Sequence, residues 1–214
     1  MPNIGQGTLQ DLIVQLRHSH SQEFRAYWNA NKYRLCAHAV KAVWTLFTRT
    51  GGLLHQDIKP ENFVVLDQNR EGALLAIANY GKATMDSETQ SSKVTNEYYA
   101  PPELFSQETI DTEKYDVFCL GQLWITIING INTPILSNSN RDTCANVNQD
   151  RQEANPASFF SMWGGTALNE DREAMNLIAR MISQNPEDRQ TLDELMADPF
   201  IQKHSQDLTT ADAQ

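Results

Sequence analysis

The sequence is poor in positive charge. Its 214 residues include 17 lysines and arginines against 27 aspartates and glutamates, so the formal net charge is -10 at pH 7. Nucleic acids and anionic membrane surfaces are bound by basic patches or stripes. The acidic balance therefore argues against nucleic acid and against a membrane surface as partners.

Cysteine is also scarce. Cys36, Cys119 and Cys144 are odd in number, widely spaced and free of CxxC pairs. This pattern argues against a disulfide framework or a zinc site and indicates a reducing compartment, so we predict a cytoplasmic protein. His18 and His20 have no carboxylate or cysteine nearby at ligand spacing, and we interpret them as part of a solvated turn.

Long hydrophobic runs are missing as well. The most apolar stretch, 117–131, is interrupted by Gly121, Gln122 and Asn129 and is shorter than the roughly 18 apolar residues of a membrane span. It predicts a buried helix over 116–128. No secretory signal is visible at the N-terminus.

The composition, with 40% apolar residues, is typical of a globular protein of one domain or one large lobe. The elements that we expect along the chain are mainly α-helical. Apolar spacing predicts a helix over 9–16, a strong helix over 33–49, a helix capped by Asn169, and a last helix that begins at Thr191. Two short apolar runs, 63–66 and 74–77, predict a small β-hairpin. We expect a polar loop over 82–97, an irregular stretch over 131–156 and a frayed tail from Lys203 onward.

The octet His55-Gln56-Asp57-Ile58-Lys59-Pro60-Glu61-Asn62 carries the strongest chemical signal. It combines a carboxylate, an ammonium two residues later and an amide five residues later. Phosphoryl transfer needs a base for a hydroxyl, a cation for a phosphate and a ligand for magnesium. On its own, such an octet is also compatible with an ordinary surface turn.

Four further landmarks follow the octet in a fixed order, and together they are specific. These are Asn79-Tyr80-Gly81, Pro101-Pro102-Glu103, the segment Asp116 to Gly121, and Arg189. The chain resembles the C-terminal lobe of eukaryotic-type protein kinases of the serine/threonine type, whose corresponding motifs are H-R-D-x-K-x-x-N, D-F-G, A-P-E, D-x-W-S-x-G and a late arginine. The resemblance covers residues 1–202, a kinase-like helical bundle with the small hairpin after the catalytic loop, and leaves 203–214 as a polar tail.

The resemblance implies roles for the matching positions. Asp57 would be the catalytic base, Lys59 would steady the γ-phosphate, and Asn62 and Asn79 would be the magnesium ligands. Val64 would lie beneath an adenine ring, so ATP and Mg²⁺ are the implied cofactors, and a protein substrate or regulatory protein is the implied partner.

The resemblance also implies structural contacts. His55 and Tyr80 would stack inside the lobe and be anchored on Asp116. Glu103 and Arg189 would form an ion pair.

Several positions depart from the kinase pattern. Asn79 replaces the D-F-G aspartate, Gln56 replaces the catalytic-loop arginine, and Asn96 stands where a threonine usually faces the substrate. No G-x-G-x-x-G loop and no strand lysine are found, so we expect the N-terminal lobe to be absent.

Three functions stay open at this point. The first is a serine/threonine kinase domain that is impaired as this chain, and the second is a pseudokinase-like binding module or scaffold. The third and weakest is a small-molecule phosphotransferase, against which Lys59, the Pro101-Pro102-Glu103 closure and Arg189 argue.

Overall fold

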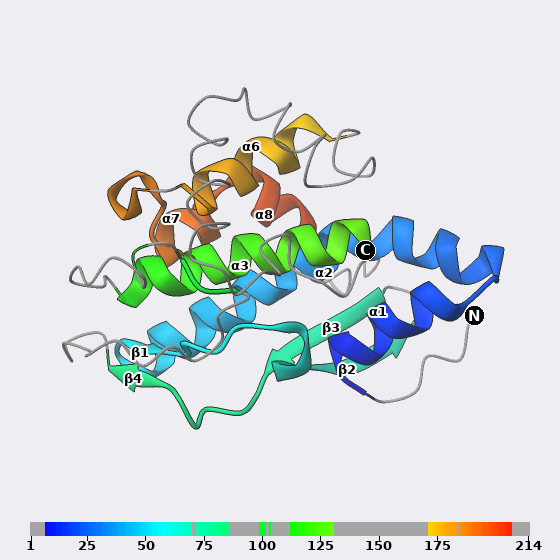
Figure 1. Cartoon of the computed structure of the whole chain (residues 1–214), viewed down its shortest axis with the longest axis horizontal. Helices are drawn as coiled ribbons and strands as arrows, with labels where there is room; N and C mark the ends of the chain where they lie inside the picture. The colour runs from blue at the N-terminus through cyan, green and yellow to red at the C-terminus, as the bar shows by residue number, and fades with distance from the viewer. Residues whose placement is uncertain are drawn as a thin grey trace, which may run out of the picture.

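The chain is mainly α-helical and carries two small antiparallel sheets (Figure 1). The computed structural model describes residues 7–69, 72–85, 99–101, 103, 112–130, 171–183 and 185–206. The predicted mainly α architecture with a hairpin is confirmed for these residues. Among them, no helix combines the length and the apolar character needed to cross a bilayer.

A single long helix, α2 (Gln22–Thr50), forms the axis of the fold. The Ser21 side chain caps its first turn, and Gly51 ends it in the left-handed conformation with a φ of 74°. The prediction that this helix begins at Tyr33 was wrong. The preceding segment is polar at most positions, but Phe24 and Trp28 are spaced one turn apart and are both buried, so the helix continues through it.

Several elements pack against α2 and bury its apolar side chains. Helix α3 (Thr112–Asn129) lies beside it in Figure 1, and α7 (Leu192–Ala197), α8 (Pro199–Ser205) and the strand β3 (Gly72–Ile77) also contact it. The predicted buried helix is α3, which extends beyond both ends of the predicted range 116–128.

Helix α3 also packs closely on α6 (Arg172–Met181), and a glycine makes this possible. A β-carbon at Gly121 would overlap the side chain of Ile182 and crowd that of Met181. The two backbones can therefore approach each other only because position 121 has no side chain.

Helix α1 (Leu9–His18) closes the core beside β2 (Phe63–Asn69). A capping box between Thr8 and Asp11 starts it. The exposed His18 ends it, and His20 lies in the short exposed connection to α2, in keeping with the predicted turn.

The predicted hairpin is formed by β2 and β3, with Phe63 opposite Ile77 and a register shift between Val65 and Asp67. A second sheet pairs β1 (Leu53–Leu54) with β4 (Thr84–Met85). Because β4 lies inside the stretch predicted as a structureless loop, that prediction was wrong for its first residues. Two-residue strands have no period that a sequence pattern can reveal.

The C-terminal helices begin and end at positions that differ from the predicted ones. Asp171, not Asn169, caps α6, because its carboxylate accepts from the backbone of the first turn. The 3₁₀ turn η4 (Pro186–Asp188) separates α6 from the last helices. The predicted last helix is in fact two helices, because Asp198 ends α7 and caps α8. The tail predicted to fray from Lys203 is still helical at its start, since α8 continues to the buried Ser205.

Some predictions lie outside the described residues. These concern Asn169 itself, the irregular stretch 131–156, the remainder of the loop with Asn96, and the end of the tail from residue 207. Cys36 and Cys119 are buried free thiols, and Cys144 is likewise not described.

The predicted pair between Glu103 and Arg189 is present and buried. The two guanidinium nitrogens donate to the two carboxylate oxygens at 2.6 and 2.8 Å, and the side chains are 3% and 0% exposed. Arg189 also donates to the Ser183 carbonyl and lies 4.8 Å over the Phe118 ring. The pair therefore joins the residue after the two prolines to α3 and to the segment before α7.

We expect Arg189→Ala to lower the free energy of unfolding by about 3–5 kcal/mol, because it removes the bidentate charged partner of the buried Glu103 carboxylate. Urea denaturation measures this change. Arg180→Ala is the matched control, since the Arg180–Asp198 pair is also 2.8 Å long but its arginine is 51% exposed, and its loss should change the free energy by less than about 1 kcal/mol. Equal losses in the two variants would contradict the structural role of the buried pair.

Candidate functional site

The first two residues of the octet are bound by the carboxylate of Asp116 on α3. Its Oδ2 accepts from the His55 backbone N–H at 2.7 Å and its Oδ1 accepts from the Gln56 N–H at 2.9 Å. Asp116 is fully buried, and Gln56 is held at a φ of 57°, a conformation that costs about 1 kcal/mol or more for a residue other than glycine. The bidentate contact thus fixes the strained turn that precedes Asp57.

The register of the hairpin brings two amide side chains together. Asn62 ends the 3₁₀ turn η1 (Pro60–Asn62), and its carbonyl accepts from the Ala78 N–H at 2.8 Å. The next residue, Asn79, has a φ of 69°, which asparagine tolerates better than most residues. Its Nδ2 donates to the Asn62 Oδ1 over 3.1 Å. The two predicted magnesium ligands are therefore neighbours, and they bind each other.

The small sheet of β1 and β4 brings a second lysine to the site. Leu54, opposite Thr84, leads directly into the octet, and a single residue, Ala83, separates Lys82 from β4. The Lys82 ammonium consequently lies 3.4 Å from the Asp57 Oδ1. Sequence reasoning missed this residue because the contact depends on a pairing of two-residue strands.

Asp57 is buried and ionised. Its Oδ2 accepts from the Asn62 Nδ2 at 3.1 Å and pairs with the Lys59 ammonium at 3.0 Å. Burial raises the pKa of Asp57, but the hydrogen bonds from Lys59 and Asn62 and the charges of Lys59 and Lys82 outweigh it, so the pKa lies below the usual range. Such a carboxylate can orient a hydroxyl group and accept its proton.

The donor set does not fit a magnesium ion well. Magnesium is normally held by one or two carboxylates together with phosphate oxygens and water. Asn62 and Asn79 are neutral amides, and the Asn62 Oδ1 is already occupied by the Asn79 amide. In the described part of the chain, no cluster of three His, Cys, Asp or Glu side chains offers an alternative.

His55 and Tyr80 do contact each other, but edge to face and not as a parallel stack. Their ring centroids are 5.7 Å apart, and the His55 Nε2 lies 2.9 Å from the Ala78 carbonyl oxygen. The Tyr80 hydroxyl donates to the Ile77 carbonyl at 2.6 Å. Tyr80 is 48% exposed, so it lies at the surface and not inside the core.

Val64 occupies the outer face of β2. Its neighbours Phe63 and Val65 are buried, whereas Val64 is 36% exposed and bridges to Thr8. An apolar side chain on an open strand can contact a flat ring, and its role beneath adenine stays a prediction.

The helix-rich frame thus carries a buried carboxylate, a lysine and an amide on the loop before the hairpin, and a second lysine on the chain after it. The family described as protein kinase domain matches residues 3–201. The chain belongs to the protein kinase family.

Two curated relatives show what the chain is similar to. It is 27% identical over 151 residues to a calcium and calcium/calmodulin-dependent serine/threonine-protein kinase of Pisum sativum, a match that covers 70% of this chain and 27% of that protein. It is 24% identical over 161 residues to serine/threonine-protein kinase 17A of Oryctolagus cuniculus, covering 74% and 38%. The chain thus spans well under half the length of these relatives.

A solved structure supports the fold. A chain in the structure of the CAK complex from Chaetomium thermophilum bound to ATP-γ-S superposes with a TM-score of 0.67 at 16% identity. The match covers 92% of this chain and 64% of that chain. The fold is therefore kinase-like.

We expect a pH effect on stability that originates at Asp116. Burial raises its pKa to about 7, with the backbone N–H groups of His55 and Gln56 opposing the rise and the charge of Glu113 adding to it. Between pH 4 and 7 the folded chain retains a proton that the unfolded chain has released. Raising the pH through this window should therefore lower the free energy of unfolding, on the order of a few kcal/mol.

The measurement is urea denaturation of the wild type and of Asp116→Asn at several pH values. The variant is expected to be less stable overall, because its amide cannot accept both backbone bonds, but it lacks this titration. The stability difference between wild type and variant should shrink as the pH rises from 4 to 7. A difference that stays constant over this window would contradict the raised pKa.

Proposed function

We propose that this chain is a serine/threonine-type protein kinase domain that carries out little or no magnesium-dependent phosphoryl transfer on its own. The observation that carries the proposal is the hydrogen bond from the Asn79 Nδ2 to the Asn62 Oδ1. It joins the two residues that would hold the metal, and both are neutral.

The substrate side of the site is better equipped than the metal side. Asp57 is ionised and oriented by Asn62, and Lys59 is close enough to contact a transferred phosphate. These groups suit the hydroxyl of a protein serine or threonine. ATP and magnesium are the cofactors that the family implies. When bound, magnesium would neutralise charge on the phosphates, a contribution that two amides support weakly.

A phosphotransfer assay with ATP, Mg²⁺ and a mixed serine/threonine peptide library tests the proposal. The isolated chain should turn over no faster than Asp57→Asn, which keeps the shape of the site but removes the base. Turnover clearly above this control would show that the proposed impairment is wrong.

Restoring the carboxylate should strengthen metal binding. We expect Asn79→Asp to raise the affinity for Mg²⁺ by roughly tenfold in the presence of ATP, because a charged ligand replaces an amide and aspartate also tolerates a positive φ. Isothermal titration measures this change. Asn69→Asp, which adds the same charge at the far end of β2, is the control. An unchanged affinity would mean that the substitution at position 79 is not what weakens the metal site.

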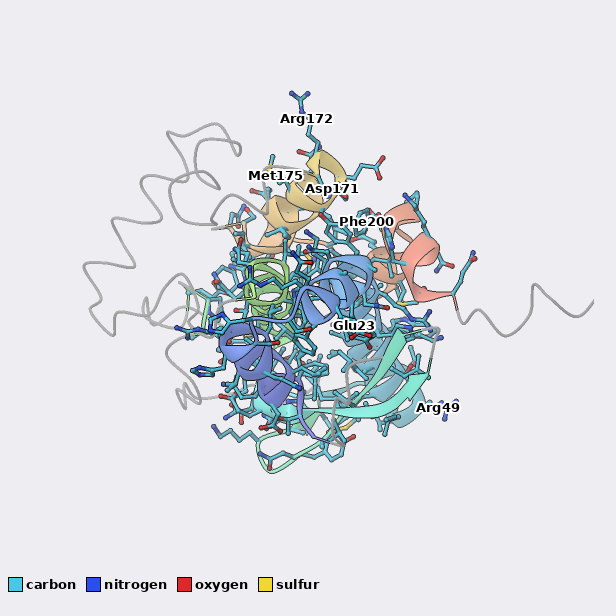
Figure 2. All side chains as sticks on the ribbon, turned by 90° about the vertical axis from the view of Figure 1, so that its right-hand side faces the viewer. Glu23, Arg49, Asp171, Arg172, Met175 and Phe200 are labelled. Atoms are coloured by element: carbon cyan, nitrogen blue, oxygen red, sulfur yellow. The ribbon has the colours of Figure 1, made fainter. Side chains whose placement is uncertain are left out.

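A second candidate function is a protein-binding module, and a groove favours it. A cavity of about 440 Å³ lies between α2 and the β2–β3 hairpin. Its apolar lining includes Leu46, Leu74 and the 61% exposed Leu66. Lys41 and Arg49 line it from α2, and no carboxylate is among the described residues that line it. Figure 2 shows Arg49 at the margin of the molecule beside the hairpin.

This lining fits a partner segment that combines apolar side chains with acidic ones. Fluorescence anisotropy with two labelled peptides tests this preference. The peptides share one apolar pattern, and one is flanked by glutamates and the other by lysines. We expect the acidic peptide to bind more tightly and Arg49→Glu to weaken it by about fivefold, whereas Arg25→Glu, exposed on the same helix, should have little effect. Equal binding of the two peptides would exclude this groove as an acidic docking site.

A further inference from the structure

Two positive charges reach solvent directly beside the Asp57 carboxylate. Lys59 and Lys82 pair with different oxygens of one carboxylate, that of Asp57. Their side chains are 23% and 38% exposed, whereas that of Asp57 is 3% exposed. A charged group that approaches from water therefore meets two ammonium groups before it meets the carboxylate.

This arrangement is unsuited to a cation and suited to an anion. A divalent cation would approach two like charges, and the nearby Asn62 and Asn79 contribute no negative charge to offset them. A phosphate group would be attracted by the same ammonium groups. The ammonium groups of Lys59 and Lys82 thus favour an anion over a magnesium ion beside Asp57.

We propose that Lys82, together with Lys59, binds the phosphate groups of a nucleotide without a divalent cation. This inference rests on the proposed function, since it assigns to Lys82 the charge neutralisation that the weakened metal site lacks. The ligand class is a nucleoside triphosphate, and the contact is between ammonium and phosphate oxygens.

The position of Lys82 allows such a contact. The backbone that follows is held by the pairing of β4 with β1, so the lysine starts from a fixed place. Its side chain is a flexible stem with a compact point charge that can turn from one acceptor to another. The Asp57 Oδ2 keeps its partners Lys59 and Asn62 when Lys82 turns to a phosphate.

Isothermal titration of the chain with ATP in EDTA tests the proposal, with adenosine and inorganic triphosphate as comparison probes. ATP and triphosphate should bind without metal, adenosine should bind far more weakly, and added salt should weaken ATP binding. Lys82→Met should weaken ATP binding by about tenfold, Lys82→Arg should restore most of it, and Lys203→Met, exposed on α8, should have no effect.

Three results would overturn the inference: ATP binding that appears only when Mg²⁺ is added, no ATP binding in either condition, or equal affinities of the wild type and Lys82→Met. Thermal unfolding of the unliganded variants checks that Lys82→Met is folded. Failure here is separable from failure of the proposed function, because the latter depends on turnover in the presence of Mg²⁺ and not on binding in EDTA.

Discussion

The contact between the Asp116 carboxylate and two consecutive backbone N–H groups holds the loop that carries the candidate site. It links the buried helix α3 to the turn at His55 and Gln56, a turn that the chain would not adopt unaided. A carboxylate without water around it is costly unless its oxygens are hydrogen-bonded. The same requirement that satisfies Asp116 therefore fixes the loop that presents Asp57.

The helical frame keeps the kinase pattern more completely than the candidate site does. The Glu103–Arg189 pair, the close contact at Gly121 and the capped helices form a tightly constrained scaffold. At the site, by contrast, amides stand beside a carboxylate that is already paired with two lysines. A family fold can be retained for its packing while the charges of its site change, and for that reason fold alone does not establish activity.

Much of the fold could be predicted from the sequence, because its signals are local. The apolar period of α3, the capping box at Thr191 and the hairpin runs need only neighbouring residues to be recognised. The ion pair at Arg189 followed from the family resemblance. The start of α2 was missed because burial of Phe24 and Trp28 depends on distant helices. Lys82 was missed for a similar reason, since only the pairing of β1 with β4 carries it to Asp57.

The sheet of β1 and β4 has one more consequence. It consists of two residue pairs, so opening it would expose little apolar surface and require little free energy compared with unfolding of the core. Such an opening would free Lys82 from its place beside Asp57 while α2 and α3 stayed folded. The position of one of the two lysine charges thus depends on a sheet of only two residue pairs, and native-state hydrogen exchange of the hydrogen-bonded amides in this sheet would report how often it opens.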